Sequence, residues 1–539
     1  AEIPSPWKMK DMERAVQILQ KKITQKKKIR IIGDYDIDGI QSTYILYCAL
    51  KRIGAEADYV IPHRIRDGYG MNEHLVTQAA EVGIDTILTC DNGISAIDQI
   101  HLAKELGMTV VVTDHHEVPY IEENGVRREK ISEADAIVNP KQEACQYPFK
   151  KLCGAAVAWK LVQVLYEQAG IPVSEADRFI ENAGFATVGD VMDLQGENRV
   201  LVKLGLKMLN QTQNIGMKAL ILQSNRKLGE IRSGDIGFGL GPCLNATGRL
   251  ETARIALKLL LCESEAEAAV LAQEAVDLNN SRKLLTEQAV EVAKQMIADG
   301  GYENDRVFVI FLPDCHESLA GIVAGRIREA YHRPTLVITR GEEGAKGSGR
   351  SIEGYSMFEE LNKCADLLSS FGGHPMAAGF SLPEENIEAF RRRLNEVCTL
   401  TEEELQAKVV IDVPMPIGYI TFPLIEQLKL LEPFGKGNDK PVFADRNLVI
   451  ERLKIYGPTG RVVQLTLHSS SGAKVQAVYF GDPDNLRLPL EEKYGKVVAD
   501  DTMANRCVHN AALHFTYYPE IDTYYETPRV KLKITGISA

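Results

Sequence analysis

Residues 31–43, IIGDYDIDGIQST, place aspartates at alternate positions, Asp34, Asp36 and Asp38, directly before Gly39. The order D-x-D-x-D-G also opens an EF-hand calcium loop, whose twelfth position must be a bidentate Glu. Counted from Asp34, that position is Ile45, whose apolar side chain cannot bind a cation. The residues before the acids form a short apolar run typical of a strand, where an EF-hand would have a helix. The calcium interpretation fails, which leaves a solvated acidic turn or another kind of metal site.

Further acids and imidazoles follow other apolar runs along the first half of the chain. Asp91 follows TILT, Asp114, His115 and His116 follow VVVT, and Asp190 follows the apolar start of ATVGDVMDL. A single acid at the end of a strand is usually the N-cap of the next helix. Capping alone does not explain three successive strand ends of this kind, one of them Asp-His-His. The pattern therefore favours one shared site.

So many carboxylates can converge only around cations, because their mutual repulsion would otherwise protonate some of them. Carboxylates with one or two imidazoles suit a hard octahedral ion, Mn²⁺ or Mg²⁺, and the imidazoles favour manganese. Zinc would prefer cysteine, and no cysteine is suitably placed. Two such ions about 3.5–4 Å apart bind the attacking and the leaving oxygen of a phosphoryl displacement. The residues thus predict a binuclear centre for phosphoester hydrolysis.

The elements that position these side chains are strands and helices in alternation. Residues 28–120 contain four short apolar runs separated by helical stretches, which indicates a parallel α/β sheet with its ligands at the carboxyl ends of the strands. Residues 152–170 and 197–224 have a helical pattern. Residues 262–299 predict one long helix, because they are rich in Ala, free of Pro and followed by Gly300. A second α/β block spans 301–400, and an all-β tail typical of a small barrel follows.

The bulk properties are those of a globular protein of several domains. The chain has 539 residues, 45% of them hydrophobic, and a formal net charge of −12, which argues against nucleic-acid binding over the whole surface. We find no apolar run long enough for a transmembrane helix. The ten cysteines are scattered, and the first residues, AEIPSPWKMK, lack the apolar core of a signal peptide. We therefore expect a cytoplasmic protein with reduced thiols.

Successive motifs resemble those of a known superfamily. DYDIDG, CDNG, TDHHE and GDVMDL are similar to the motifs of the DHH phosphoesterases, and the letters DHH are residues 114–116. Later stretches resemble the RecJ family of single-stranded-DNA exonucleases in particular. They are GFGLGPCLNATGRL (237–250), GSGRSIEGYSMFEEL (347–361), FGGHPMAAGFSL (371–382) and LEPFGKGNDKPVF (431–443). The resemblance runs in order over nearly the whole chain.

This resemblance implies an α/β multidomain protein. Its expected parts are a parallel-sheet DHH domain (1–261), a connecting helix (262–300), an α/β DHH-associated domain (301–402) and a C-terminal OB-fold β-barrel (403–539). It also implies processive 5′→3′ hydrolysis of single-stranded DNA to mononucleotides, in DNA repair and recombination, with two Mn²⁺ or Mg²⁺ ions.

The resemblance also assigns the metal ligands. They are Asp36, Asp38, Asp91, His115 and Asp190, with Asp91 bridging the two ions. Asp34 is a further ligand or a base, since apolar Ile32 occupies a place where other superfamily members have His. Asp193 stands where the family has Pro, which leaves the choice between Asp190 and Asp193 open. His116 is expected to support its neighbour His115.

Residues for the substrate follow from the later motifs. Ser348, Arg350 and Ser351, in an expected Gly-flanked loop, offer hydroxyls, a guanidinium and backbone N–H groups to a phosphate. The family context makes Arg64, Asn245 and Arg249 candidates for the 5′ end and the scissile phosphate, and places Gly373 and His374 opposite the metals. His374 is also a candidate catalytic residue, together with Asp34, His115 and His116. Cys243 stands where the family often has Arg. In the barrel, bases could stack on Phe434, Tyr456, Tyr479 and Phe515, unless these rings belong to the core.

Three classes of function remain open. The first is the processive nuclease, and the second is a DHH-superfamily phosphodiesterase for short oligonucleotides, cyclic dinucleotides or pyrophosphate. The third is a replication scaffold that has lost its metals, which the intact Asp36, Asp38, Asp91 and His115 contradict. The β-rich tail favours the nuclease, because small-substrate relatives generally end after the DHH-associated domain. We expect a monomer that binds single-stranded DNA carrying a 5′-phosphate and no membrane, with a single-strand-binding protein or a helicase as its protein partner.

Overall fold

The first apolar runs form a parallel five-stranded sheet with the strand order β2-β1-β3-β4-β7. Its strands are β1 (Ile29–Ile32), β2 (Ala57–Val60), β3 (Thr86–Cys90), β4 (Thr109–Thr113) and β7 (Ala136–Val138). The first four confirm the predicted parallel sheet. The sequence pattern missed β7, which has only three residues, and the antiparallel hairpin of β5 (Tyr120–Glu123) and β6 (Val126–Glu129).

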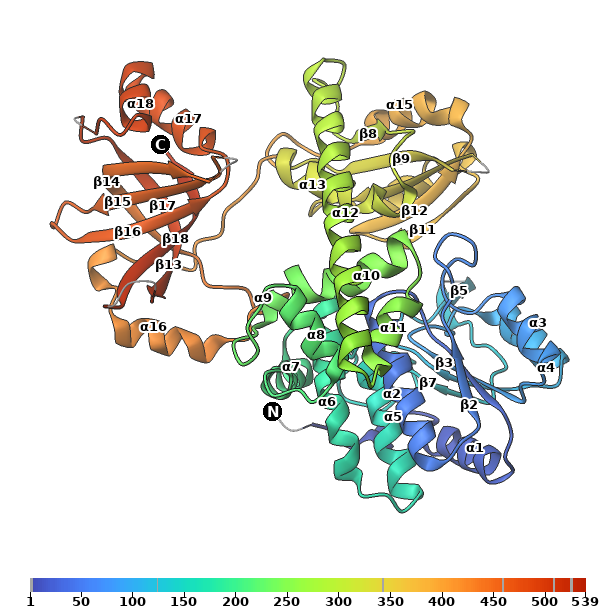
Figure 1. Ribbon diagram of the computed structural model, residues 1–539. Coiled ribbons are helices and arrows are strands. Elements are labelled where there is room, and N and C mark those ends of the chain that lie inside the picture. The colour runs from blue at the N-terminus through green and yellow to red at the C-terminus, as the bar shows by residue number, and fades with distance from the viewer. Residues whose placement is uncertain (1–2, 124, 342–343, 458–459, 508, 524–526) are drawn as a thin grey trace. The chain divides into compact units, whose positions relative to one another are not determined.

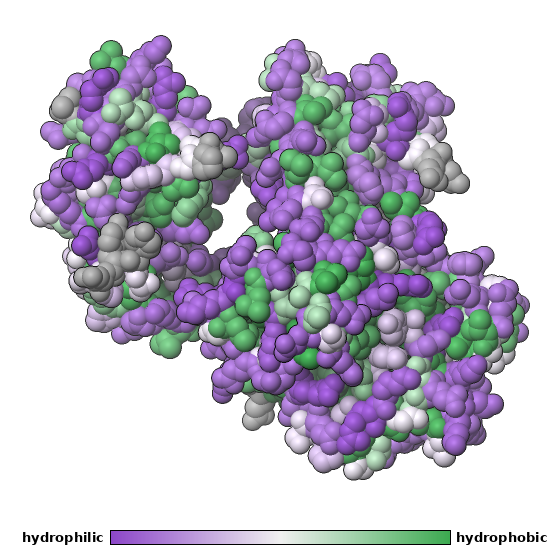
Figure 2. Space-filling view, viewed as in Figure 1, coloured by the Kyte–Doolittle hydropathy of each residue, from purple (hydrophilic) through white to green (hydrophobic). Residues whose placement is uncertain are grey.

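The computed structural model describes residues 3–123, 125–341, 344–457, 460–507, 509–523 and 527–539. The chain divides into two compact units, one up to residue 407 and one from residue 408 (Figure 1). The surface seen in Figure 2 is mostly hydrophilic, with apolar side chains in scattered patches. Among the described residues, no helix combines the length and the apolar character that crossing a membrane requires.

Helices cover both faces of the parallel sheet, because successive strand residues point to opposite sides. Leu88 and Cys90 of β3 join one core, with helices α1 (Met12–Thr24), α2 (Ile37–Ile53) and α5 (Gly154–Gln168). Ile87 joins the core on the other face, with α3 (Glu73–Glu81) and α4 (Ile97–Glu105). At the carboxyl edge of the strands, the first turns of α2 and α5 come together, with Asp38 of α2 bonded to the N-terminus of α5.

A group of shorter helices follows the sheet. They are α6 (Ile180–Gly189), α7 (Gly196–Leu209), α8 (Ile215–Gln223), α9 (Ser233–Asp235), α10 (Gly241–Leu250) and α11 (Arg254–Leu261), with a π-helical turn, η3 (Ile236–Leu240), before α10. The helical pattern predicted over 197–224 corresponds to two helices, α7 and α8, with a break at residues 210–214. Asn214 caps a new helix there, because its side chain accepts a hydrogen bond from the Met217 backbone N–H.

The predicted long helix is α12 (Glu265–Ala298), which has 34 residues and begins at the N-cap Ser264. Its first half packs in one core with α8, α10 and α11 through Ala268, Ala272 and Ala275. Near its end, Ala293 belongs to a different core, formed with the second α/β block. The helix is therefore packed at both ends and links the two blocks of the first unit (Figure 1).

The second α/β block holds a mixed five-stranded sheet with the order β11-β12-β10-β9-β8. Its elements are β8 (Phe308–Phe311), α13 (Ala320–Tyr331), β9 (Thr335–Gly341), β10 (Gly344–Arg350), α14 (Met357–Asn362), β11 (Ser370–His374), β12 (Ala377–Leu382) and α15 (Ile387–Val397). Strand β10 corrects the prediction of a loop around Ser348. Its backbone pairs with β9 on one side and β12 on the other, so its N–H groups are not free to bind phosphate.

The second unit is the predicted β-barrel. Strand β14 (Phe443–Tyr456) pairs with both β15 (Val462–His468) and β17 (Ala512–Asp522), and β16 (Lys474–Phe480) and β18 (Arg529–Ser538) complete the closed ring. The short β13 (Val413–Pro414) and helices α16 (Phe422–Leu428), α17 (Asp484–Tyr494) and α18 (Lys496–Met503) were not predicted.

Candidate metal centre and substrate cleft

The turn between β1 and α2 explains the spacing of the first aspartates. Asp36 is the N-cap of α2, and its Oδ1 accepts hydrogen bonds from the backbone N–H groups of Asp38 (3.0 Å) and Gly39 (3.1 Å). A Cβ atom on Gly39 would lie 2.5 Å from the carbonyl oxygen of Asp34, so this turn requires glycine. The capping interpretation is thus correct for Asp36, but it leaves Asp34 and Asp38 to be explained.

Asp38 is fully buried and points at the start of α5. Its Oδ2 accepts from the Gly154 N–H (2.6 Å), and its Oδ1 accepts from the Ala155 N–H (2.7 Å). The N-terminus of a helix stabilises a carboxylate through these N–H groups and through the helix dipole. Asp38 is therefore held in one orientation by an element more than a hundred residues away in the chain.

Asp91, directly after β3, has a left-handed backbone conformation. Its φ of 61° lies in the left-handed region, which is uncommon for residues other than Gly, Asn and Asp. The Tyr69 hydroxyl donates a 2.7 Å hydrogen bond to the Asp91 carbonyl oxygen. The backbone conformation and the Tyr69 hydrogen bond together fix the position of Asp91 after β3.

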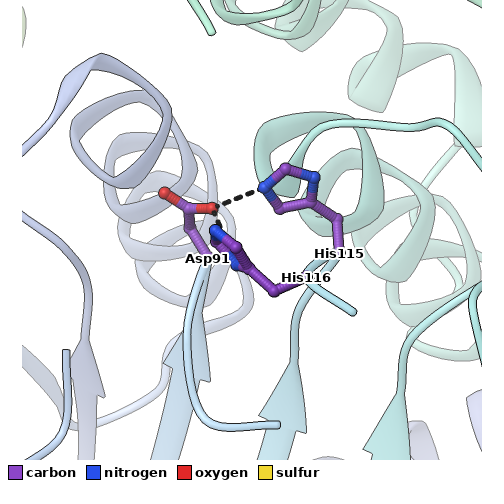
Figure 3. A group of neighbouring side chains, drawn as sticks. All are labelled: Asp91, His115 and His116. Atoms are coloured by element: carbon purple, nitrogen blue, oxygen red, sulfur yellow. Dashed lines mark ion pairs between the residues drawn. The ribbon is translucent and has the colours of Figure 1, made fainter. Parts of the chain in front are cut away.

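His115 brings the acids of different strands together. Its Nε2 lies 3.0 Å from Asp91 Oδ1, 3.5 Å from Asp38 Oδ2 and 3.8 Å from Asp190 Oδ2. Figure 3 shows the rings of His115 and His116, which follow β4, both facing the carboxylate of Asp91. The convergence expected at the carboxyl edge of the sheet is present.

His116 lies beside this group and is held by Asp114. Its Nδ1 is 2.8 Å from Asp114 Oδ1 and 4.0 Å from Asp91 Oδ1. Burial lowers the pKa of His116, but the Asp114 carboxylate more than offsets this and raises that pKa to about 9. Asp114 also accepts hydrogen bonds from the backbone N–H groups of His115 and Ile94, so it orients the whole turn after β4.

The donor atoms fit two hard cations. Among the described residues, three groups have ligand atoms within 4.8 Å of one another: Asp34 with Asp36 and Asp91, Asp38 with His115 and Asp190, and Asp91 with His115 and His116. Asp91 is shared by two of them, as a bridging ligand would be.

The same atoms show the need for cations. The buried atoms Asp34 Oδ2, Asp91 Oδ1 and His115 Nδ1 have no hydrogen-bond partner within the described part of the chain. Burial, followed by the carboxylates of Asp38 and Asp36, raises the pKa of Asp91 well above its usual range. Burial, and then the carboxylate of Asp36, also raise the pKa of Asp34 well above its usual range. Mn²⁺ or Mg²⁺ would relieve this repulsion and use oxygen and imidazole ligands of the type present.

The two candidates for the last acid lie in different surroundings. Asp190 is the C-cap of α6 and places Oδ2 3.8 Å from His115 Nε2. Asp193 forms a 2.5 Å ion pair with Lys151 and belongs to none of the three donor groups found among the described residues. The geometry therefore favours Asp190 as the ligand.

A cleft of about 630 Å³ adjoins the metal centre, between the parallel-sheet block and the second α/β block. Its lining includes Tyr35, Arg64 and Tyr69 from the first block and Lys346 and Ser348 from the second. The Arg64 guanidinium lies 4.8 Å from the centre of the Tyr35 ring. Ser348 thus faces the cleft as expected, although it does so from strand β10.

Arginines from separate segments gather near this cleft. Arg249 Nη1 donates a 2.7 Å hydrogen bond to the carbonyl oxygen of Ser318, which lines the cleft. Burial, and then the nearby cations Arg64 and Arg282, lower the pKa of Arg249 to about 10. Burial, and then Arg328 and Arg64, also lower the pKa of Arg350. Arg64 therefore lies close to both Arg249 and Arg350, and the three cations favour an anion among them.

The structure corrects the expectation for Ser351. The residue is fully buried, its hydroxyl donates to the Tyr355 carbonyl oxygen (2.6 Å), and its N–H donates to the Met376 carbonyl oxygen. Ser351 cannot bind a phosphate without breaking these bonds. It supports the fold behind the cleft.

Other expected substrate residues have structural tasks. The Oδ1 of Asn245 accepts a 2.8 Å hydrogen bond from the backbone N–H of Ile37, the first residue of α2, so Asn245 fixes the turn that carries Asp36.

Strand β11 ends with Gly373, which has a φ of 147°, and the exposed His374. In the described part of the chain, no hydrogen bond or ion pair joins His374 to the acids, and its role stays a prediction. Cys243 is buried beside Asn279 and Ser224.

In the barrel, only some of the proposed aromatics face outward. Phe515 is buried in the core, so the stacking prediction was wrong for this ring, and Phe434 packs against Tyr518. Tyr456 is exposed and lines a groove of about 410 Å³ together with Arg452 and Lys454.

Tyr69 and Gly154 were missed at the sequence level. Tyr69 binds the Asp91 carbonyl oxygen and lies 3.1 Å from His116 Nδ1, yet a single Tyr in the stretch DGYG gives no pattern to recognise. Gly154 begins α5, and a glycine at the start of a helix is not distinctive in a single sequence. Both residues act on Asp91 through contacts between distant segments.

Comparison with family models matches three successive parts of the chain. Residues 28–182 match the DHH family N-terminal domain, residues 304–400 match the DHHA1 domain, and residues 411–536 match the RecJ OB domain. A parallel sheet with acids and imidazoles at its carboxyl edge, in a chain with these matches, defines a protein of the DHH class.

Curated relatives and solved structures are more specific. The chain is 38% identical over 475 residues to the single-stranded-DNA-specific exonuclease RecJ of Bacillus subtilis, covering 87% of this chain and 58% of that one. It is 34% identical to the RecJ of Escherichia coli, covering 81% and 78% of the two chains. The crystal structure of RecJ with Mn²⁺ from Thermus thermophilus matches with a TM-score of 0.79 and 26% identity, over 100% of this chain and 72% of that one.

The chain belongs to the RecJ family. It spans less than two thirds of the length of its Bacillus subtilis relative. A second Thermus thermophilus structure, of RecJ with Mg²⁺, matches with a TM-score of 0.74 and 25% identity, over 100% of this chain and 71% of that one. Mn²⁺ and Mg²⁺, the metals in these two Thermus thermophilus structures, are the ions that the carboxylates and imidazoles of this chain predict.

Proposed function

We propose that this protein is a metal-dependent exonuclease that hydrolyses single-stranded DNA from its 5′ end. The observation that carries the proposal is the convergence of Asp38, Asp91 and Asp190 on His115, next to a cleft with arginines. Membership of the RecJ family, whose curated relatives are named single-stranded-DNA-specific exonucleases, supports the substrate.

The chain's own residues hold and orient the reacting groups. Asp36, Asp38, Asp91, His115 and Asp190 would bind the two ions, with Asp34 beside them. When bound, the ions supply charge for the attacking and the leaving oxygen and lower the pKa of a bound water. Asp114 and Tyr69 fix His116 next to Asp91, where its ring can donate a hydrogen bond to a phosphate oxygen. Gly154 and Ala155 fix Asp38 from the opposite side.

The arginine cluster supports recognition of a 5′-phosphate. Arg64 repels both Arg249 and Arg350, and a dianionic phosphate near these guanidinium groups would offset that repulsion. Ser348 can add a hydroxyl from the cleft wall. Such a site would hold the terminal phosphate while the next phosphodiester bond lies at the metals, so cleavage would proceed 5′→3′.

The barrel supports binding of the rest of the strand. The lining of its groove includes the exposed Tyr456 and four cations, Arg452, Lys454, Arg529 and Lys531, the last of them paired with Asp522 at 3.1 Å. Cations beside an aromatic surface are typical of single-strand binding, because the backbone and the unpaired bases are contacted together. A single-strand-binding protein or a helicase as partner, the monomeric state and the cytoplasmic location stay predictions.

The test uses 5′-labelled and 3′-labelled single strands with Mn²⁺, scored for the length of the labelled product. A 5′→3′ exonuclease releases a labelled mononucleotide at once from the 5′-labelled strand and gives a shortening ladder from the 3′-labelled one. The reverse pattern would overturn the polarity. Cleavage restricted to dinucleotides, trinucleotides or cyclic dinucleotides would favour the small-substrate phosphodiesterase, which the barrel disfavours.

A further inference from the structure

One aromatic side chain in the first unit is almost entirely exposed. Phe238 lies in the π-helical turn Ile236–Leu240, and its side chain is 85% exposed, although its neighbours Ile236 and Leu240 are buried. Single π-helical turns are rare and occur frequently at functional sites. A large apolar ring in water gives up the free energy of burial, so its position calls for a partner.

The turn that presents the ring is held in place. The Arg226 guanidinium packs against Gly239, where an added Cβ would lie 2.2 Å from Nη2, and Arg226 Nε donates a 3.0 Å hydrogen bond to Asp235. The turn continues directly into α10, whose first residue is Gly241. Phe238 is therefore presented by a packed element.

The turn adjoins the elements that carry two metal-binding acids. An added Cβ on Gly189 would lie 2.4 Å from Ile37 Cδ1, and one on Gly241 would lie 3.1 Å from the same atom. Ile37 follows Asp36, and Gly189 precedes Asp190. The start of α10, the end of α6 and the start of α2 thus meet at one side chain next to the metal centre.

Helix α10 separates Phe238 from the arginine cluster. Arg249, near its C-terminal end, bonds to Ser318 at the cleft. Phe238 precedes the N-terminal end of this helix of ten residues, which is about 15 Å long. Asn245 lies between them and fixes the turn of Asp36. Phe238 and Arg249 thus lie toward opposite ends of one helix whose middle bonds to the metal-binding turn.

We infer that Phe238 is a stacking platform for a nucleobase on the 3′ side of the scissile phosphate. The inference rests on the proposed function, because it takes single-stranded DNA as the substrate and the arginine cluster as the site of its 5′ end. Every base offers a flat face to an aromatic ring, so this contact would act on strands of any sequence. It would hold the strand in register while the terminal nucleotide is removed.

The test combines Phe238 variants with a scan of abasic sites. The substrates are 5′-phosphorylated 12-mers, each lacking one base at positions 1 to 6 from the 5′ end. Binding is followed by fluorescence anisotropy without divalent metal, and kcat/KM is measured with Mn²⁺. The variants are Phe238→Ala and Phe238→Trp, with Leu284→Ala, an exposed apolar residue of α12, as the control.

For the wild-type chain, we expect one abasic position on the 3′ side to weaken binding and lower kcat/KM by roughly tenfold. Phe238→Ala should cause a similar loss on the intact strand and no further loss on that abasic strand. Phe238→Trp should bind as well as wild type, and Leu284→Ala should change neither quantity. Melting temperatures within experimental error of wild type would establish that the variants are folded.

Equal losses by Phe238→Ala on all strands, or no loss on any, would overturn the inference while leaving the proposed function intact. A changed sedimentation coefficient of Phe238→Ala with unchanged DNA binding would also overturn it, because the ring would then serve a protein contact. Failure of the wild-type chain to bind and cleave single strands would overturn the proposed function and the inference together.

Discussion

Gly154 faces Asp91 so closely that an added Cβ atom would lie 2.7 Å from the Asp91 Cβ. The two residues come from α5 and the end of β3, and the Gly154 N–H also binds Asp38. One small residue thus positions two of the acids around His115. The predictions below start from this relationship.

We expect Gly154→Ala to fold but to lose hydrolysis by on the order of a hundredfold, because the added methyl group displaces Asp91 by a large fraction of an ångström. Mn²⁺ binding, measured by calorimetry, should weaken in parallel. Gly234→Ala is the control, since a Cβ at Gly234 meets no atom within 4 Å. Wild-type activity of Gly154→Ala would show that the close approach is unimportant.

Asp91→Ala should abolish hydrolysis and leave the fold intact. Burial and the neighbouring acids raise the pKa of Asp91, so its removal relieves repulsion and should raise the melting temperature without metal. Added Mn²⁺ should raise the melting temperature of the wild-type chain but much less that of the variant, because only a bound metal stabilises the folded state. More than a tenth of wild-type turnover in the folded variant would contradict the binuclear site.

Arg350→Ala should reduce cleavage of 5′-phosphorylated strands by roughly 10- to 100-fold, the range for loss of a charged hydrogen bond. Cleavage of 5′-hydroxyl strands should change much less, because the lost contact is to the terminal phosphate. Arg393→Ala, on helix α15, is the matched control. Equal losses on the two substrates would mean that Arg350 does not bind the 5′ end.

A chain ending at residue 407, the boundary between the two units, should still cleave a trimer. On a 60-mer it should lose affinity and release fewer nucleotides per binding event, because the barrel groove is gone. Salt should weaken binding of the full chain to the 60-mer, with a slope of about −0.7 per phosphate contacted. Equal impairment on both substrates, or on neither, would show that the barrel does not hold the DNA.

Lys160→Met should destabilise the protein by about 3–5 kcal/mol, because it leaves the buried Glu197 without its cation. Lys160 is fully buried, with Nζ 2.9 Å from Glu197 Oε1 and 2.8 Å from the Pro4 carbonyl oxygen. The double variant Lys160→Met with Glu197→Gln should recover part of the loss in urea unfolding. A double variant no more stable than Lys160→Met would rule out the unpaired carboxylate as the cause.

The sequence alone determined the sheet and most of the metal centre. Short buried strands alternate with helices, and parallel strands end at the same edge, so Asp38, Asp91 and His115 had to lie near one another. The barrel was equally predictable, because its short strands follow one another without intervening long helices and alternate apolar with polar residues, as in β15. These patterns are local, so a single sequence contains them.

Tertiary structure decided what depends on contacts between distant segments. Gly344–Arg350 is rich in glycine and resembles a loop, yet its pairing with β9 and β12 makes it a strand and leaves Ser351 buried behind it. Asp190 and Asp193 are both acids near the end of α6, and only their distances to His115 and Lys151 separate them. Gly154 gains its importance from the approach of α5 to Asp91. Packing between elements sets these relationships, and no local pattern of residues records them.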